Sequence, residues 1–524
     1  MHVAIQNSER AKVEMSLRDE KLVGLNLVLA LIALGLGYVD ILSNVSGHSI
    51  MTPYIAGSLQ GVTPSYSAWG TTIYLIGVAL GVSLSKPVSG RFGEIRVLSI
   101  GFLFYSVISL TCSQSETVYF YAPCRFAFGA IGGILAAVAQ AVALNELPER
   151  YYKVGLGYWA TLGMMPYTFA VFMGGFWAEY FSWKWLFYAN AMIGIFIGLL
   201  VESLFYGRQH EKHTYPIDWI GFLLLSLSIV SIQLMLSQGN DYDWFGSPWL
   251  SILILVTLIS LPLFLIWEWG EENPILDLSL FSETSFTLGC ILGFLGFFVI
   301  QGLMSLLSVQ MQLILGYSSS TAGDIYLAMM LAGLPLAGFM YEISKKLDVR
   351  FVISIMFLSS SVVLTWFGLF DKVGSFDALP IPVIFLGLCV AALSAPLATL
   401  ATRCFKGKVY KKAAEEFLIL RLIGGAYGIA FQSIIYVRRT PYHLNDLADY
   451  LGGRRYASYD SYGQFFSKLQ SLGYSDTIVG RLIARFIRQQ ASVLALNDAF
   501  LLGALILLIC SVLVWFANSE YEAV

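Results

Sequence analysis

Residues 22–44 read LVGLNLVLALIALGLGYVDILSN, an almost entirely apolar stretch that is long enough to cross a bilayer as a helix. A spanning helix needs about 20 predominantly apolar residues. The segment before it, residues 1–21, ends in the charged sequence SLRDEK and lacks the short cationic region and cleavage site of a signal peptide. We therefore predict that residues 22–44 stay in the membrane as the first of its helices.

The composition of the whole chain agrees with this stretch. Of the 524 residues, 57% are hydrophobic and only 12% are charged, whereas about 25% of residues are charged in a typical soluble domain. The net charge of −3 gives no basic excess of the kind that binds nucleic acid. The cysteines lie in or beside apolar runs without metal-ligand spacing. The composition predicts a protein embedded in a lipid bilayer, with no cofactor, no metal and no nucleic-acid partner.

Applied along the chain, the same length rule predicts an all-α protein with about fourteen transmembrane helices in the order six, two, six. The predicted divisions are an N-terminal tail (1–21), a first six-helix bundle (22–206), a hinge (207–217), two inserted linker helices (218–270), a second six-helix bundle (271–517) that includes a long loop (437–495), and a C-terminal tail (518–524).

The distribution of Lys and Arg predicts the orientation. Alternate loops carry most of these residues, while the short loops on the other side carry only Lys184 and Lys372. This predicts that both tails and the hinge are cytoplasmic. The long loop 437–495 would then lie outside although it is rich in arginine, because the charge rule weakens for long loops.

The long loop also contains a helical pattern. Ile478, Leu482 and Phe486 recur at helical spacing, while Arg481 and Arg485 share another face, which predicts an amphipathic helix. Two interpretations stay open: a helix that caps the outer rim, and a docking surface for another protein or for lipid headgroups.

Asp40 and Arg125 lie inside predicted spans, where an ionisable group is costly unless it is paired or hydrated. Both fall in the outer half of the membrane, where an ion pair or a shared water cavity can form. Such a pair can bind a proton, because protonation of the carboxylate releases the arginine. The alternative is that Asp40 reaches the interface and Arg125 only ties helices together.

Two further charges lie inside predicted spans of the second bundle. Asp324 is a candidate for proton coupling, unless it simply reaches the outer interface. Arg421 is the candidate charged site of the second bundle, unless it pairs with Glu415 or Glu416 near the inner surface.

Clusters of glycine mark places where helices can approach closely. They comprise Gly129, Gly132 and Gly133 in the fourth span and Gly174 and Gly175 in the fifth. Helix packing is the first interpretation, and in a moving transporter the same surfaces can also slide or bend.

With the six–two–six pattern, an ordered set of motifs resembles the fourteen-span drug:proton antiporters of the major facilitator superfamily, and most closely the EmrB-type multidrug efflux proteins. The motifs are YIAGSL (54–59), RFGEIR (91–96), GGFWAEYFSWKWLFYAN (174–190), LGYSSSTAG (315–323) and RLIGGAYG (421–428). The resemblance extends from about residue 27 to residue 517.

The resemblance implies two six-helix bundles, a central cavity and alternating access. It also implies that Asp40 and Arg125 couple transport to protons. In the family the acidic residue lies closer to the following proline, whereas here Pro53 comes later, as if about one helical turn were inserted. The antiport motif of the fifth span departs as well, since MPYTFAVFMGG (165–175) has its proline earlier, at Pro166.

In the superfamily, the loop between the second and third spans bonds across the cytoplasmic ends of the bundles and holds the outward-open state. Here the segment SKPVSGRFGEIR (85–96) is about four residues shorter and lacks the usual acidic position. We predict a shortened latch, formed by Gly90, Arg91, Gly93, Glu94 and Arg96. The alternative is cationic anchoring of a short cytoplasmic loop.

The sequence contains no P-loop, GxSxG or HExxH pattern. We therefore predict no enzymatic activity, and transport driven by an ion gradient. The leading hypothesis is an exporter of amphipathic small molecules that exchanges them for protons. The alternatives are a dedicated exporter of one metabolite, such as a siderophore or lipid, and a non-transporting membrane scaffold or sensor. The resemblance also implies a location in the inner membrane, with the loop 437–495 in the periplasm. It implies two partners as well: a periplasmic adaptor and an outer-membrane channel.

Overall fold

The computed structural model describes residues 21–59, 64–148, 159, 162–163, 166, 169–206, 217–370, 380–451, 463–464, 467–472 and 475–518. The predicted N-terminal tail, hinge and C-terminal tail therefore lie almost wholly outside the described residues. The middle of the long loop and most of the first half of the predicted fifth span also lie outside them.

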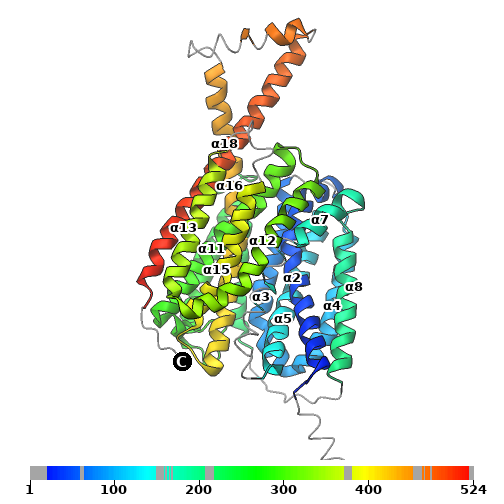
Figure 1. Cartoon of the computed structure of the whole chain (residues 1–524), viewed down its shortest axis with the longest axis vertical. Helices are drawn as coiled ribbons and strands as arrows, with labels where there is room; N and C mark the ends of the chain where they lie inside the picture. Colours follow the sequence, from blue (N-terminus) through cyan, green and yellow to red (C-terminus); the bar gives the residue numbers. More distant parts are fainter. Residues whose placement is uncertain are drawn as a thin grey trace, which may run out of the picture.

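Two bundles of six helices stand side by side (Figure 1). The first consists of α2 (Leu25–Ser58), α3 (Pro64–Phe92), α4 (Glu94–Ser113), α5 (Val118–Glu146), α7 (Phe169–Tyr180) and α8 (Trp185–Leu204). The second consists of α11 (Thr284–Val309), α12 (Ser319–Lys346), α13 (Val349–Gly368), α15 (Pro380–Thr402), α16 (Gly407–Leu451) and α18 (Asp476–Leu513). Between them in sequence come α9 (Trp219–Gln238) and α10 (Pro248–Gly270).

The described residues also include four short helical segments. Three lie between helices: η3 (Trp244–Gly246), η4 (Leu278–Ser282) and the π-helical η5 (Gln310–Ile314). The fourth, η6 (Val514–Phe516), follows α18.

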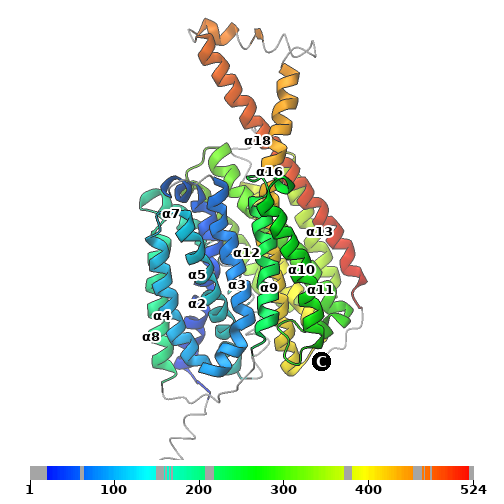
Figure 2. The same cartoon turned by 180° about the vertical axis from the view of Figure 1, so that it is seen from behind.

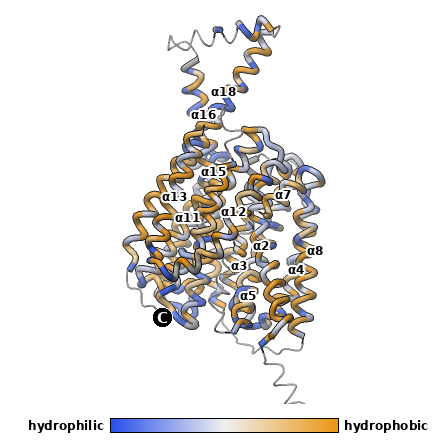
Figure 3. The backbone as a smooth tube through the Cα atoms, viewed as in Figure 1, coloured by the Kyte–Doolittle hydropathy of each residue, from blue (hydrophilic) through white to orange (hydrophobic). Residues whose placement is uncertain are grey.

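Thirteen of the described helices are long and apolar enough to cross a membrane. The fourteenth, α7, is the described end of the predicted fifth span. The prediction of an all-α membrane protein with about fourteen spans in six–two–six order is confirmed. Hydrophobic residues dominate the length of the bundles (Figure 3). Long unbroken helices are expected there, because lipid offers no partner to a free backbone amide or carbonyl group.

The inserted pair lies across the seam between the bundles (Figure 2). Helix α9 contacts both α3 of the first bundle and α16 of the second, while α10 packs against α9. Helix α10 exposes large aliphatic side chains along its length, among them Leu255, Leu258 and Ile266. Because no described residue covers these side chains, α10 presents a lipid-facing surface.

The two ends of the bundles differ (Figure 1). Helix α2 begins and η6 ends at the same end, which we call the terminal end. At the opposite end, α16 and α18 continue beyond the other helices and diverge, so we call it the projecting end. The predicted loop 437–495 is thus largely helical where it is described, and the predicted amphipathic helix is the first part of α18. This part projects away from the bundle and does not lie along its rim.

A cluster of polar side chains joins the two projecting helices at their base. Asp498 of α18 accepts hydrogen bonds from Arg439 Nε (2.5 Å) and His443 Nε2 (2.7 Å), both on α16. The Arg439 guanidinium also lies over the Tyr442 ring, 4.5 Å from its centroid. The projection therefore starts from a point where α16 and α18 are fixed to each other.

Candidate functional site

A polar stripe runs along one face of α2 inside the first bundle. Asp40, Asn44 and His48 are spaced four residues apart, which places them on the same side of the helix. All three are buried, with at most 6% of their surface exposed. Buried polar groups at this depth are costly unless they are hydrogen-bonded, and each of the three has partners on other helices.

Arg125 of α5 is the charged centre of this stripe and is completely buried. Its Nε donates to the carbonyl of Gly70 (2.9 Å), and its Nη2 and Nη1 donate to the carbonyl and the side-chain Oδ1 of Asn44 (3.0 and 3.3 Å). The guanidinium also lies 4.4 Å from the centre of the Tyr74 ring. The described residues give it no carboxylate, so neutral oxygens and a π face hold the cation.

Asp40 reaches Arg125 indirectly. Its carboxyl group lies near the Tyr105 hydroxyl and interacts with it electrostatically, and this hydroxyl accepts a hydrogen bond from Asn44 Nδ2 (3.0 Å). Asn44 in turn accepts from Arg125, and its Oδ1 also accepts from Asn190 Nδ2 (2.8 Å). The direct ion pair suggested by the sequence is thus replaced by a relay through Tyr105 and Asn44.

The register of α2 explains this arrangement. The helix runs without a break from Leu25 to Ser58, so there is no local bulge between Asp40 and Pro53. Asn44 therefore lies one turn closer to Pro53 and contacts the arginine, while the carboxylate lies one turn away. One carboxylate oxygen, Asp40 Oδ2, is buried without a hydrogen-bond partner.

Sequence reasoning missed Asn44, Tyr105, Asn190 and His48. His48 Nδ1 lies 2.7 Å from Thr71 Oγ1, and its Nε2 lies 2.8 Å from the Tyr121 hydroxyl. A neutral imidazole satisfies both contacts, with one nitrogen donating and the other accepting. The signal that could have found the stripe is the four-residue spacing of Asp, Asn and His within an otherwise apolar run.

Close helix contacts position the arginine. A side chain on Gly129 or Gly133 would place its Cβ 2.2 or 2.1 Å from the carbonyl oxygens of Tyr74 and Val78, so α5 packs directly on the α3 backbone. Gly132 faces Ile41 of α2 and the Tyr74 hydroxyl. This packing brings the Gly70 carbonyl within reach of Arg125.

The fifth-span glycines lie at contacts near the projecting end. A Cβ on Gly174 would lie 2.9 Å from the Gly47 carbonyl oxygen of α2, and one on Gly175 would lie 2.2 Å from the Ser319 carbonyl oxygen of the second bundle. Pro166 is buried, and its immediate neighbours lie outside the described ranges.

The bundles are closed against each other at the projecting end. The Ser320 amide donates to Glu179 Oε2 (2.8 Å), and Gln312 Nε2 donates to the Ile50 carbonyl (3.0 Å). Together with the close approach of Gly175 to Ser319, these bonds connect α7 and α2 to the start of the second bundle. The structure is therefore closed at the projecting end.

A cavity of about 640 Å³ opens between the bundles near the terminal end. Two bonds cross between the bundles there: Lys86 pairs with Glu415 (2.6 Å), and Lys411 Nζ donates to Asn145 Oδ1 (2.8 Å). The cavity is large enough for a small-molecule ligand, since such pockets measure about 300–1,000 Å³. The arrangement is that of a transporter closed at one end and hollow at the other.

The predicted latch segment lies at this cavity. Helix α3 ends at Phe92, and Gly93 interrupts the helical backbone with a positive φ of 90° before α4 begins at Glu94. Gly90 and Glu94 line the cavity. Arg91 and Arg96 are exposed, and within the described part of the chain neither forms a hydrogen bond or an ion pair through its side chain. The contact with the second bundle comes from Lys86, one turn earlier.

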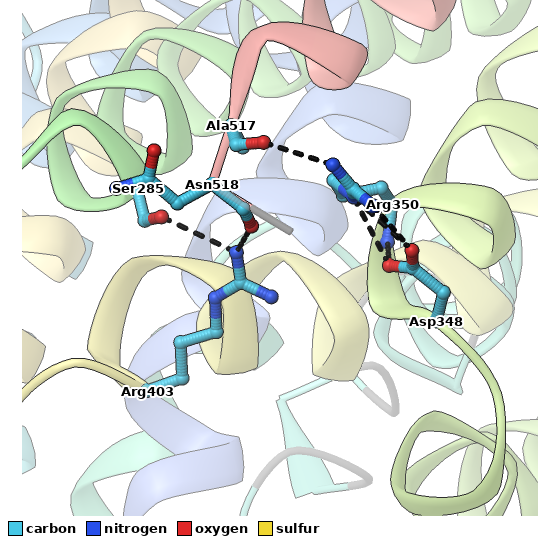
Figure 4. A network of polar contacts seen from close by, with 6 residues as sticks. All are labelled: Ser285, Asp348, Arg350, Arg403, Ala517 and Asn518. Carbon is cyan, nitrogen blue, oxygen red and sulfur yellow. Dashed lines mark hydrogen bonds and ion pairs between the residues drawn. The ribbon is translucent and has the colours of Figure 1, made fainter. Parts of the chain in front are cut away.

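At the terminal end of the second bundle, polar contacts join elements of that bundle to one another (Figure 4). Arg350 of α13 pairs with Asp348 (2.7 Å) and donates to the Ala517 carbonyl (3.1 Å), and its hydrogen bonds hold the pKa of Asp348 below the ordinary value. Arg403 of α15 donates to Ser285 Oγ (3.2 Å) and to the Asn518 carbonyl. These bonds connect the end of η6 to α11, α13 and α15.

We expect Lys86→Glu to open the terminal end. Loss of the pair and repulsion from Glu415 should raise the accessibility of the cavity several-fold, up to about fivefold, because a partly exposed pair contributes about 1 kcal/mol or less. The measurement is the alkylation rate of a Ser83→Cys reporter by an impermeant maleimide, with the exposed Cys404 replaced. The exchange Lys86→Glu with Glu415→Lys should restore the original rate. An equal effect of Arg91→Ala would instead assign the latch to the arginines.

The remaining candidates lie apart from the network. Asp324 is exposed near the start of α12 and does not meet Asp40 or Arg125. Arg421 of α16 lies over the Phe297 ring, 4.6 Å from its centroid. Neither predicted carboxylate pairs with it, because Glu415 pairs with Lys86 and Glu416 Oε1 accepts from the Asp277 amide (2.7 Å).

Comparisons with known proteins agree with this geometry. The Major Facilitator Superfamily profile matches residues 29–428. The chain is 26% identical to the "Multidrug export protein EmrB" of Haemophilus influenzae over 94% of this chain and 96% of that protein. It is also 26% identical to the "Fatty acid resistance protein FarB" of Neisseria gonorrhoeae, over 96% and 98% of the two chains.

Solved structures share the fold. The human organic anion transporter MFSD10 superposes with a TM-score of 0.54 at 11% identity, over 93% of this chain and all of that one. A peptide transporter of the POT family superposes with a TM-score of 0.56 at 14% identity, over 96% and 98% of the chains. At these identities the likeness concerns the fold alone.

Proposed function

The chain belongs to the Major Facilitator Superfamily, and from that premise we propose that it is a secondary active exporter of amphipathic small molecules, driven by proton antiport through alternating access. The multidrug export proteins among its full-length relatives support this assignment. The observation that carries the proton-coupled mechanism is the buried relay from Asp40 through Tyr105 and Asn44 to Arg125.

The relay can convert a proton into a change of helix contacts. A charged Asp40 only accepts, so Tyr105 donates to it and accepts from Asn44. Once protonated, Asp40 can itself donate to the Tyr105 oxygen, and the Tyr105 hydroxyl hydrogen then turns toward another acceptor. That change reaches Asn44, which holds Arg125 and thereby joins α2 to α5. Protonation then biases the balance between two arrangements of the bundles.

Substrate would follow the seam between the bundles. The large cavity at the terminal end is followed by two small spaces of about 10 Å³ each, which share Gln301 in their lining. Movement of the bundles would connect these spaces in turn. With the terminal end in the cytoplasm, the present arrangement corresponds to an inward-facing transporter whose outer side is closed.

The same orientation suggests a role for the projecting helices. We infer that the protein lies in the inner membrane with its termini in the cytoplasm, so that α16 and α18 extend into the periplasm. Their outer parts expose both cations and apolar side chains, such as Arg485 beside Leu482 and Phe486. Such a mixed surface fits a periplasmic adaptor, which would pass substrate to an outer-membrane channel. Photo-crosslinking from Phe486 in whole cells would test this contact.

The function itself is tested in proteoliposomes that contain the purified protein. We expect an imposed proton gradient to drive the movement of several chemically unrelated amphiphiles, and a protonophore to abolish it. Flux of one compound alone would identify a dedicated exporter. Absence of any gradient-dependent flux would contradict the proposal and favour a scaffold or sensor.

A further inference from the structure

Arg421 is a cation inside a predicted span, and its side chain has no hydrogen-bond or ion-pair partner among the described residues. It lies five residues, about 8 Å at about 1.5 Å per residue, beyond Glu416, the last charged residue before it on α16. Its Nε is buried without a hydrogen bond. Within the described part of the chain, its guanidinium contacts only the Phe297 ring, and it forms no hydrogen bond or ion pair.

Arg421 faces the seam between the two bundles. It lines one of the two small spaces there, together with Gln301 of α11. Across the seam the wall is aliphatic and belongs to the first bundle, where Leu42, Val45 and Leu75 line the same space. Neither of the two small spaces has a carboxylate in its lining.

Other unsatisfied donors accompany the arginine on the same side. Gln301 is nearly buried, and its amide forms no hydrogen bond with the described residues. Gln432 lies three turns beyond Arg421 on α16, is fully buried, and leaves both its amide nitrogen and its amide oxygen without a partner. Gln432 packs against Gly302 of α11 within the second bundle, whereas Arg421 and Gln301 line the space at the seam. Unpaired polar groups inside a protein are costly, so the two at the seam point to a ligand that binds there transiently.

We propose that Arg421, assisted by Gln301, binds the anionic headgroup of an amphipathic substrate, while the aliphatic wall of the first bundle contacts its apolar part. This inference rests on the proposed transport function and assigns its substrate class: amphiphiles that carry a carboxylate or similar anion. A carboxylate would satisfy the half-buried guanidinium, including its buried Nε, through charge-assisted hydrogen bonds. Burial of an alkyl chain against aliphatic side chains would supply the remaining affinity.

The present arrangement shows how the site is closed. The space at Arg421 measures about 10 Å³, which is room for about one water molecule. The large cavity at the terminal end reaches Ile419, two residues before Arg421 on the same helix. An amphiphile that enters this cavity therefore needs only a small separation of the bundles to bring its headgroup to the arginine.

The test compares two amphiphiles with the same tail and opposite charge. Binding of radiolabelled dodecanoate and of dodecyltrimethylammonium to the purified full-length protein is measured without any gradient. We expect Arg421→Gln to weaken dodecanoate binding at least about tenfold, the loss typical of a charged hydrogen-bonding group, and to leave dodecyltrimethylammonium binding unchanged. Arg421→Lys keeps the charge but not the fork of donors. Its affinity for dodecanoate should therefore lie between that of the original protein and that of Arg421→Gln.

Arg438→Gln is the matched control, because Arg438 also lies over an aromatic ring, that of Trp244, but in the projecting part of α16. It should bind both amphiphiles like the original protein. The proposal is overturned if Arg421→Gln binds dodecanoate normally, or loses both amphiphiles equally although it is folded. Failure of the transport function has a different signature, since gradient-driven flux would then be absent for every compound while binding at Arg421 is still measurable.

Discussion

Replacing Arg125 with glutamine should reduce proton-driven export by at least about a hundredfold. The change removes a buried cation that donates to the Gly70 carbonyl and to both oxygens of Asn44. Hydrogen bonds to charged groups contribute about 1.5–3 kcal/mol each. The loss of two or three of them therefore weakens the attachment of α5 to α2 and α3. The measurement is the initial rate of gradient-driven transport in proteoliposomes, with thermal unfolding recorded in parallel.

Lysine should not restore the function of Arg125, because a single ammonium group cannot reproduce the planar fork that reaches α2 and α3 together. Arg91→Gln is the matched control. Arg91 is exposed next to the cavity at the terminal end. Its loss should leave the transport rate within about twofold of the original rate, since exposed charges contribute little. Near-normal export by folded Arg125→Gln protein would show that the cation is only a packing residue.

Asp40→Asn should separate transport from the proton gradient. Asparagine has the shape of a protonated carboxyl group and can still bond to Tyr105, but it cannot gain or lose a proton. We expect gradient-driven export to fall by about fiftyfold or more, while exchange of labelled for unlabelled substrate continues at a measurable rate. The pair of assays is the measurement, because a structural defect would lower both rates.

Asp324→Asn is the control for this change. Asp324 is exposed and lies away from the relay, so its replacement should leave both export and exchange almost unchanged. A loss of gradient-driven export in Asp324→Asn that matched the loss in Asp40→Asn would place proton coupling elsewhere or in both bundles.

The helices could be predicted from the sequence because apolar length marks the part of a helix that meets lipid. The ends of the helices could not be predicted in this way, because several helices continue beyond the end of the apolar run. Helix α2 extends past the predicted end at residue 44 to Ser58, and α16 and α18 extend beyond the bundle. Backbone hydrogen bonds continue through these segments although polar side chains interrupt their apolar runs.

The charged members of the site stood out because charge is rare in an apolar run. Asp40 and Arg125 were found for that reason. Asn44 and Tyr105, which connect them, are neutral and resemble ordinary packing residues in the sequence. Their contacts depend on how α2, α4 and α5 meet, and a single sequence does not contain that information.

The latch shows a related limit. The sequence indicates a cationic segment but not which of its cations faces the other bundle. Because α3 continues as far as Phe92, the position of each residue around the helix decides which cation faces the second bundle. Lys86 faces Glu415, whereas Arg91 points to solvent. For Arg421 the sequence leaves open a pair with Glu415 or Glu416, and in the structure both carboxylates have other partners.

Proton release on substrate binding tests the central claim most directly. Purified protein in a weakly buffered detergent solution is mixed with a transported amphiphile, and the pH of the solution is recorded. The account predicts that the original protein releases protons when substrate binds, and that Asp40→Asn binds the same substrate without releasing any. Equal release by Asp40→Asn, or substrate binding to the original protein without release, would contradict proton antiport through Asp40.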